Sequence, residues 1–345
     1  MNFLDRNEFN FAPAPQVVEA FKNFDTQKLG FYTRIYDEGK KSIFSVFLSQ
    51  EYGIDEKQIM LGYGGEDLLK EAVHYFLTLP DHNRLMLVPK FSWWYYKSIA
   101  DEVDGKTVQY PLVEDGDTYR YDMETLTKML HELNPKILLL ASPNNPTGNA
   151  LSPSEIENLL QEAPKTTFII IDEAYASYVN RDNSYIKQLI DEFPNLLIVR
   201  TLSKFYGLPG LRMGFGFTGS GLGKFNRFGN KYLGYNRISE ELAIAALKAT
   251  DYYRNIADGM NQDRKLYESE IGALTGFKVY KSQANFILIK YPIELKESLQ
   301  NALVSEDYKI KFMNELDINT HLRITLGRPE QNRIVIDTIK KIAGK

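Results

Sequence analysis

Residues 200–214 contain the side chains of this chain that are best suited to covalent chemistry. Lys204 lies in this segment together with hydroxyl groups at Thr201 and Ser203 and a guanidinium at Arg212. A lysine amine can form a Schiff base with an aldehyde, and hydroxyls with a guanidinium can bind a phosphate through charge-assisted hydrogen bonds. A Ser-Lys pair before a Gly/Pro turn is also common in solvated loops. The spacing therefore favours a cofactor with both an aldehyde and a phosphate, provided that other segments supply its remaining partners.

A carboxylate and a phenol follow the apolar run at residues 168–171. Pyridoxal phosphate is a cofactor of the required kind, and Asp172 could keep its pyridine nitrogen protonated, so that the ring accepts the electrons released at the substrate Cα. Tyr175 could bond the 3-hydroxyl oxygen of the same ring. The carboxyl end of a central strand is where open α/β sheets build their binding sites. The alternative is that Asp172 caps a helix and Tyr175 packs in the core.

Two further loops offer hydrogen-bond donors to such a cofactor. Gly65 immediately precedes, and Glu66 begins, a stretch with helical spacing at residues 66–78, and the backbone N–H groups at the start of a helix can bind a phosphate. Asn145 lies among the turn-forming residues 142–148 and could also donate to the 3-hydroxyl oxygen. Taken alone, each segment equally fits an ordinary turn.

Phe91 and Arg323 are candidates for holding a ring and an anion. Phe91 follows a short apolar run and could stack on an aromatic ring, although such aromatic residues also pack in cores and interfaces. Arg323 lies in a strand-like segment, where a guanidinium needs an anionic partner. A substrate carboxylate, a substrate phosphate or an internal acid would each satisfy it.

The candidate residues follow short apolar runs that alternate with helical patterns. Such runs are typical of strands buried on both faces, and their alternation with helices predicts an α/β fold with a mostly parallel sheet. The predicted strands are residues 84–88, 137–141, 168–171, 196–199 and 213–217. We expect this sheet and its helices to form a large domain at residues 31–240.

The two ends of the chain differ from this pattern. Residues 1–30 carry prolines at positions 13 and 15 and predict an arm that packs on the small domain and the active site. Residues 241–345 predict a smaller α+β domain, because a long helical stretch at 239–267 precedes strands at 277–280, 285–289 and 322–325.

Composition argues against several other classes of function. The 345 residues carry a formal net charge of −4, from 41 basic and 45 acidic residues, so we expect neither nucleic acid nor a membrane as a partner. The absence of cysteine excludes thiolate metal sites, and the four histidines lack the spacing of metal ligands. The acidic start of the chain and the lack of a run of about 18 apolar residues predict a cytoplasmic protein.

The order of these features resembles that of the fold-type I pyridoxal-phosphate aminotransferases. Five loops at strand ends arrive in the order phosphate, stacking ring, asparagine, aspartate and lysine. The resemblance covers nearly the whole chain and points above all to the histidinol-phosphate aminotransferase branch, which implies a three-layer sandwich and a smaller α+β domain. The matching segments are Asn7-Glu8, Tyr36-Asp37-Glu38 and residues 64–67, 89–92, 142–148, 172–175, 201–214, 282–286 and 322–325.

The resemblance implies a role for each matching residue. Lys204 would hold the cofactor and move a proton, and Asp172 would contact the pyridine nitrogen, with Asn145 and Tyr175 on the 3-hydroxyl oxygen. The other implied roles are phosphate binding by Gly65, Glu66 (through its backbone), Thr201, Ser203 and Arg212, ring stacking by Phe91, binding of the donor carboxylate by Arg323, and contact of Tyr36 with the cofactor phosphate of a neighbouring subunit. The last role implies a homodimer. Asn7 and Arg328 are candidate substrate contacts.

The same resemblance predicts a transaminase that moves an amino group between glutamate and an oxo-acceptor, with histidinol phosphate and imidazole acetol phosphate as the leading pair. Two departures leave the acceptor open: residues 9–12 lack the family's usual proline and tyrosine, and Arg328 stands where threonine or serine is usual. The alternatives are an aminotransferase for an aromatic or other oxo-acid, an enzyme resembling the threonine-phosphate decarboxylases, and a non-enzymatic protein with this fold.

Overall fold

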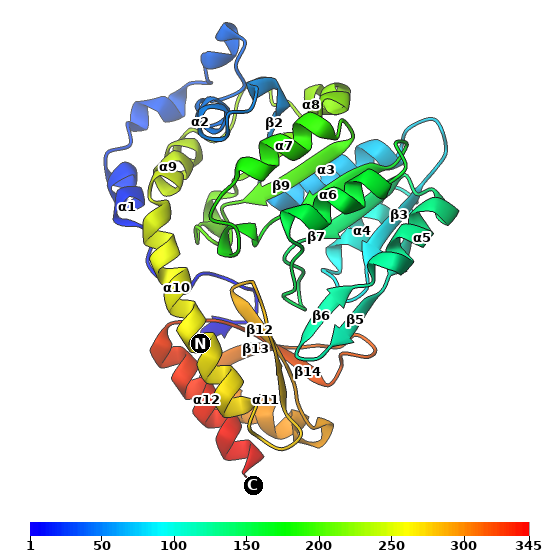
Figure 1. Ribbon diagram of the computed structural model, residues 1–345. Helices are drawn as coiled ribbons and strands as arrows, with labels where there is room; N and C mark the ends of the chain where they lie inside the picture. Colours follow the sequence, from blue (N-terminus) through cyan, green and yellow to red (C-terminus); the bar gives the residue numbers. More distant parts are fainter. Residues whose placement is uncertain (345) are drawn as a thin grey trace.

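A seven-stranded sheet forms the centre of the larger part of the molecule. Figure 1 shows the computed structural model, which describes residues 1–344. The strand order is β2-β10-β9-β8-β7-β3-β4, and β10 runs antiparallel to both of its neighbours while the pairs from β9 to β4 are parallel. The bounds are β2 (Ile59–Gly62), β3 (Leu85–Pro89), β4 (Lys106–Tyr110), β7 (Ile137–Ala141), β8 (Phe168–Asp172), β9 (Leu196–Thr201) and β10 (Gly214–Thr218). The predicted α/β fold with a mostly parallel sheet is confirmed.

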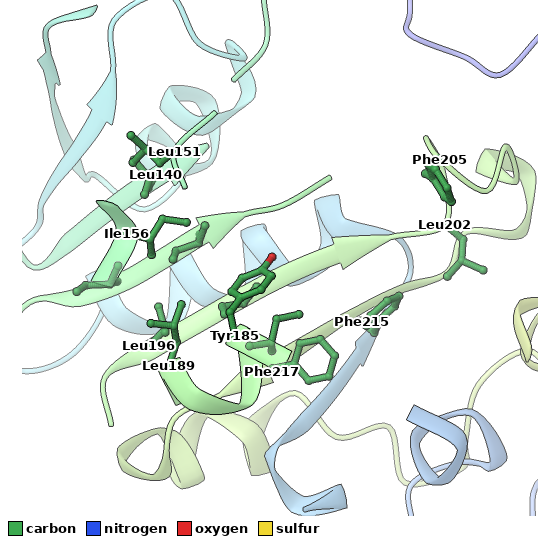
Figure 2. Close-up of a cluster of buried hydrophobic side chains, with 14 of the residues drawn as sticks. Leu140, Leu151, Ile156, Tyr185, Leu189, Leu196, Leu202, Phe205, Phe215 and Phe217 are labelled. Carbon is green, nitrogen blue, oxygen red and sulfur yellow. The ribbon is translucent and has the colours of Figure 1, made fainter. Parts of the chain in front are cut away.

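Helices cover both faces of this sheet, which explains why its strands are almost entirely apolar. In β7, Leu138 and Leu140 enter one core, whereas Leu139 and Ala141 enter the other. One core contains residues of α2 (Ile43–Tyr52), α5 (Met123–Leu133), α6 (Pro153–Glu162) and α7 (Ser184–Glu192), and the other contains residues of α3 (Gly65–Leu77), α4 (Tyr95–Asp101) and α8 (Gly223–Phe228). Figure 2 shows part of the first core, with Ile156 of α6 and Leu189 of α7 lying against the strands.

A second sheet of five strands forms the smaller part of the molecule. Its order is β1-β13-β14-β12-β11, with bounds β1 (Asn2–Leu4), β11 (Lys278–Tyr280), β12 (Phe286–Lys290), β13 (Tyr308–Phe312) and β14 (His321–Thr325). The predicted arm therefore contributes an edge strand, since β1 pairs in parallel with β13. The apolar residues of α11 (Lys296–Ser305) and α12 (Pro329–Ala343) pack with this sheet.

The two parts of the molecule are connected by the arm, a hairpin and a long helix (Figure 1). Beyond β1, the arm contains α1 (Pro15–Lys22), which packs on α9 (Arg237–Lys248). The hairpin of β5 (Leu112–Asp115) and β6 (Thr118–Tyr121) reaches the second sheet, where the backbone N–H of Lys281 donates to the carbonyl of Asp117 over 2.7 Å. No helix within residues 1–344 is long and apolar enough to cross a membrane.

The long helical stretch predicted at residues 239–267 is interrupted at Ala249, where the chain leaves helical geometry. The structure has α9 followed by α10 (Thr250–Leu266) and a π-helical turn at Tyr267–Ile271. Ala249 has a ψ of 22°, and the hydroxyl of Thr250 donates to the carbonyl of Leu247 over 2.6 Å, which satisfies one of the carbonyls left free at the end of α9. After the bend, Tyr253 is fully buried and its hydroxyl accepts the N–H of Ala14 in the arm.

Gly214 allows β10 to lie directly against the turn that begins α3. A Cβ atom at this position would stand 2.3 Å from the carbonyl carbon of Gly64 and 2.5 Å from the nitrogen of Gly65. Since real Cβ atoms do not approach backbone atoms so closely, any larger residue must push the two segments apart. Gly65 also lies next to Thr201 of the neighbouring β9. A Cβ atom added at Gly65 would lie 3.5 Å from the Cβ of Thr201.

We expect Gly214→Ala to lower the free energy of unfolding of the protein by about 1–3 kcal/mol, the usual cost of overpacking. Urea or thermal unfolding of the purified protein measures this change. Gly210→Ala is the matched control, because a Cβ there has nothing within 4 Å and Gly210 does not have a positive φ. Equal stability of the two variants would contradict the close packing of β10 on the α3 turn.

Candidate active site

Asp172 is the last residue of β8 and is 7% exposed. Its carboxylate accepts hydrogen bonds from the hydroxyl of Tyr96, over 2.7 Å, and from the N–H of Ala174, over 2.9 Å. Burial raises the pKa of this carboxyl above its usual range, while the two hydrogen bonds oppose that rise by stabilising the charged form. Sequence reasoning missed Tyr96, because the aromatic residues 93–96 gave no sign of which ring would turn toward the carboxylate.

Lys204 lies in the loop after β9, close to Tyr175. Its Nζ donates to the carbonyl of Arg6 over 3.0 Å and lies 5.9 Å from the centroid of the Tyr175 ring. Burial lowers the pKa of the amine to about 8, helped by the charge of Arg323 and opposed by those of Glu8 and Asp172. A substantial fraction of the amine is therefore neutral near pH 7 to 8, as a nucleophile or base must be.

Arg323 holds a buried positive charge on β14, with only 8% of the residue exposed. Its guanidinium donates to the side-chain oxygen of Asn145 and, over 2.5 Å, to the carbonyl of Asp5, and it stands 5.5 Å from the centroid of the Phe286 ring. Within residues 1–344, no carboxylate lies at ion-pair distance from it, and its Nε has no hydrogen-bond partner. Such a guanidinium is ready to bind an external carboxylate or phosphate.

Asn7 and Tyr175 join the arm to the larger sheet. The Nδ2 of Asn7 donates to the Tyr175 hydroxyl over 2.8 Å, and the N–H of Asn7 donates to the hydroxyl of Thr325 over 2.9 Å. Burial raises the pKa of Tyr175 to about 12, against the lowering effects of Arg323 and Asn7, so the phenol keeps its proton at neutral pH. The Asn145 oxygen is bonded to Arg323, which leaves the amide nitrogen of Asn145 as a donor.

The loops after β2 and β9 bring together the predicted phosphate ligands. Gly65 is the first residue of α3, a helix of 13 residues, so unpaired backbone N–H groups and the positive end of the helix dipole lie there. In the neighbouring loop, the hydroxyl of Thr201 donates to that of Ser203 over 2.9 Å and accepts the N–H of Ser203 over 3.1 Å.

Arg212 completes this group from the turn that precedes β10. Its guanidinium lies close to Gly64: a Cβ atom added at Gly64 would be 2.8 Å from Nη2 of Arg212. In the structure Nη2 bonds the carbonyl of Tyr63 and the carboxylate of Glu66, each over 3.2 Å. A helix start, two hydroxyls and this half-exposed guanidinium are the donors that a phosphate needs, so the residues present fit pyridoxal phosphate.

Three candidate residues are not hydrogen-bonded to this group in the part of the chain described. The buried ring of Phe91 packs edge-on against Tyr119, with 6.1 Å between the ring centroids. Tyr36 packs against Tyr232, with 4.5 Å between centroids. Arg328 precedes α12 and forms a 3.0 Å ion pair with Glu330. Their roles, like those of the other candidate site residues, stay predictions.

A buried ion pair behind the site was also missed from the sequence. The Nε of Arg200 donates to the carboxylate of Glu173 over 2.8 Å, and both side chains are 3% exposed or less. The hydroxyl of Tyr185 bonds both partners. Because Glu173 follows Asp172 and Arg200 precedes Thr201, this pair ties together the two loops that carry the site. The adjacency was visible in the sequence, but the pairing was not.

The comparisons with known proteins agree with the fold. Residues 2–339 match the family model described as aminotransferase class I and II. A histidinol-phosphate aminotransferase of Bacillus pumilus is 30% identical over 306 residues, which are 88% of this chain and 81% of that protein.

Solved structures show the same architecture at lower identity. The histidinol-phosphate aminotransferase of Clostridium acetobutylicum is 20% identical with a TM-score of 0.86, covering all of this chain and 99% of that one. The L-threonine-O-3-phosphate decarboxylase of Porphyromonas gingivalis is 18% identical with a TM-score of 0.81, covering both chains fully. Together with the family match over residues 2–339, these findings show that the chain belongs to the class I and II aminotransferases, with the fold-type I architecture.

Proposed function

We propose that this protein transfers the amino group of glutamate to an oxo-acceptor, and that histidinol phosphate and imidazole acetol phosphate are the second substrate pair. The observation that carries this proposal is Arg323, a buried guanidinium without a carboxylate partner in the described chain, whose charge acts on Lys204. The glutamate carboxylate is the partner that the guanidinium lacks. The cofactor is pyridoxal phosphate, as in the family to which the chain belongs.

Four residues of the protein would each have a role in the reaction. When bound, pyridoxal phosphate supplies an electron sink for the negative charge that develops at the substrate Cα. Asp172, held by Tyr96, would keep the pyridine nitrogen protonated. The neutral amine of Lys204 would accept the Cα proton, a role that its lowered pKa suits. Tyr175 and the Asn145 amide would donate to the 3-hydroxyl oxygen.

Two observations support histidinol phosphate as a substrate: the positive charges near the site and the similarity to histidinol-phosphate aminotransferases. A phosphorylated substrate needs cations, and the chain places Arg323 in the site on β14 and Arg328 three residues beyond the end of that strand, at the start of α12. Arg328 would have to leave its ion pair with Glu330 to reach a ligand. The proposal of histidinol phosphate is supported by relatives with that activity in their names, of which the B. pumilus protein is 30% identical.

We also propose that the active form is a homodimer, with Tyr36 of one chain at the cofactor phosphate of the other. The segments around Tyr36 and Tyr232 lie side by side and expose large apolar side chains: Phe31 is 65% exposed, Tyr32 62% and Tyr232 66%. Exposed large apolar side chains on neighbouring segments are typical of an interface.

Lys204→Ala should abolish transamination and the visible absorption of the bound cofactor, because it removes the amine to which the cofactor would be bonded. Absorbance spectroscopy, with mass spectrometry after borohydride reduction, measures the bond. Lys265→Ala, an exposed lysine on α10, is the control and should behave as the unchanged protein. A reduced cofactor still attached to Lys204→Ala would sink the assignment.

The lowered pKa of Lys204 predicts a pH profile in the protein freed of cofactor. Only the neutral amine reacts with aldehydes, so reductive methylation of Lys204 by formaldehyde should rise tenfold per pH unit and level off above about pH 8. Arg323→Gln removes a cation that lowers this pKa, so the midpoint should move to higher pH. Mass spectrometry of the Lys204 peptide follows the reaction. A midpoint above pH 10, as in a free lysine, would contradict the account.

A panel of amino compounds tests the substrates one half-reaction at a time. Glutamate and histidinol phosphate should each discharge the visible band, whereas aromatic amino acids should react more slowly. Arg323→Gln should raise the KM for glutamate by about 100-fold, as expected for losing a buried charged contact. Arg120→Gln, on the exposed β5–β6 hairpin, is the control. Release of carbon dioxide from threonine phosphate, without any need for an oxo-acid, would instead identify a decarboxylase.

A further inference from the structure

The environment of the Tyr175 hydroxyl assigns a role to Asn7 that differs from substrate binding. The Nδ2 of Asn7 donates to this hydroxyl over 2.8 Å. Because the tyrosine oxygen accepts that hydrogen bond, its own proton must point elsewhere. Within residues 1–344, no acceptor is bonded to that proton. The hydroxyl is thus left as a donor on the side away from Asn7.

The orientation of the Asn7 amide follows from Thr325. The Thr325 hydroxyl accepts the backbone N–H of Asn7 over 2.9 Å, so its own proton is available to the side-chain oxygen of Asn7, which lies 3.4 Å away. That contact turns the amide oxygen toward Thr325 and the amide nitrogen toward Tyr175. Thr325 is fully buried, so water does not compete for these groups.

The backbone of Asn7 is held as firmly as its side chain. Its φ of 57° lies in the left-handed region, which asparagine tolerates better than most residues. Its carbonyl accepts a hydrogen bond from Asn285 over 3.1 Å, and Asn7 itself is 1% exposed. The preceding carbonyls of Asp5 and Arg6 accept from Arg323 and Lys204. A side chain fixed in this way, with both polar atoms used, has little freedom to contact a substrate.

We infer that Asn7 is a positioning residue, which fixes the Tyr175 hydroxyl as a donor toward the 3-oxygen of the cofactor. The inference rests on the proposed function, because it needs pyridoxal phosphate bound on Lys204. A hydrogen bond donated to the 3-oxygen stabilises negative charge there and opposes protonation of the bound chromophore. Loss of that donor should raise the pH at which the visible band titrates.

Asn7→Asp reverses the polarity of the contact while keeping the shape of the side chain and its tolerance of a positive φ. The tyrosine would then donate its proton to the new carboxylate instead of the cofactor. In the protein loaded with pyridoxal phosphate, we expect the midpoint of the spectral titration to rise by about one pH unit, as it should for Tyr175→Phe. Asn7→Gly suits the backbone without adding charge, and should shift the midpoint in the same direction by less.

The Tyr175→Phe background separates the hydroxyl from the added charge. In this background, Asn7→Asp should change the midpoint of the spectral titration only through its added charge. The shift of the double variant should therefore be smaller, by about one pH unit, than the sum of the shifts that Asn7→Asp and Tyr175→Phe produce separately. Asn7→Gly should not change the midpoint in this background. Asn10→Asp is the matched control on the same arm, since Asn10 donates to the carbonyl of Glu8 and not to Tyr175. It should produce only the small shift of a more distant charge.

The outcomes are distinct. Equal shifts for Asn7→Asp with and without the Tyr175 hydroxyl, or a rise in KM with an unchanged titration, would overturn the positioning role and return Asn7 to the substrate contacts. If Asn7→Asp fails to fold, Asn7→Gly decides by the same comparison. Absence of any visible band in the unchanged protein, after pyridoxal phosphate is added, would instead overturn the proposed function and the inference with it.

Discussion

The half-buried amine of Lys204 and the buried guanidinium of Arg323 are the two cations at the centre of the candidate site. Their charges repel one another, which contributes to the lowered pKa of Lys204. Burying a charge without a counter-ion is costly, and here the bonded partners are neutral oxygens: the carbonyl of Arg6 for Lys204, and the carbonyl of Asp5 and the side-chain oxygen of Asn145 for Arg323. A bound carboxylate would relieve this cost at Arg323. The positive charge of Arg323 also favours the neutral form of the Lys204 amine.

The rest of the architecture can be understood as the support for this pair. The large sheet carries Asp172 and Lys204 at the carboxyl ends of β8 and β9, where parallel strands converge. Arg323 comes from β14 of the second sheet. The arm lies between them, because β1 is an edge strand of the second sheet while Asn7 bonds Tyr175 of the larger one. The site therefore needs both sheets and the arm, although its parts lie more than 300 residues apart in sequence.

Much of this could be predicted from the sequence, since strands buried on both faces must be apolar and the residues that follow them must meet at one edge. That reasoning predicted Asp172 and Lys204 as candidate site residues, whereas Arg323 was predicted because a guanidinium within a strand needs an anionic partner. It missed Tyr96, one of several aromatic side chains in a row, and the carbonyls of Asp5 and Arg6, because a backbone oxygen leaves no mark in a sequence. The interruption of the helix at Ala249 was not predicted either, because alanine is a strong helix former and leaves no sign in the sequence of the change in ψ there.

The central claim is that Arg323 is a carboxylate site beside Lys204, and a crystal structure of the protein with pyridoxal phosphate and an unreactive dicarboxylate tests it most directly. The account predicts one carboxylate of the ligand paired with both terminal nitrogens of Arg323, in place of the bond to the Asp5 carbonyl, with the cofactor attached to Lys204. A ligand bound elsewhere, with Arg323 still bonded to Asp5 and Asn145, would contradict it.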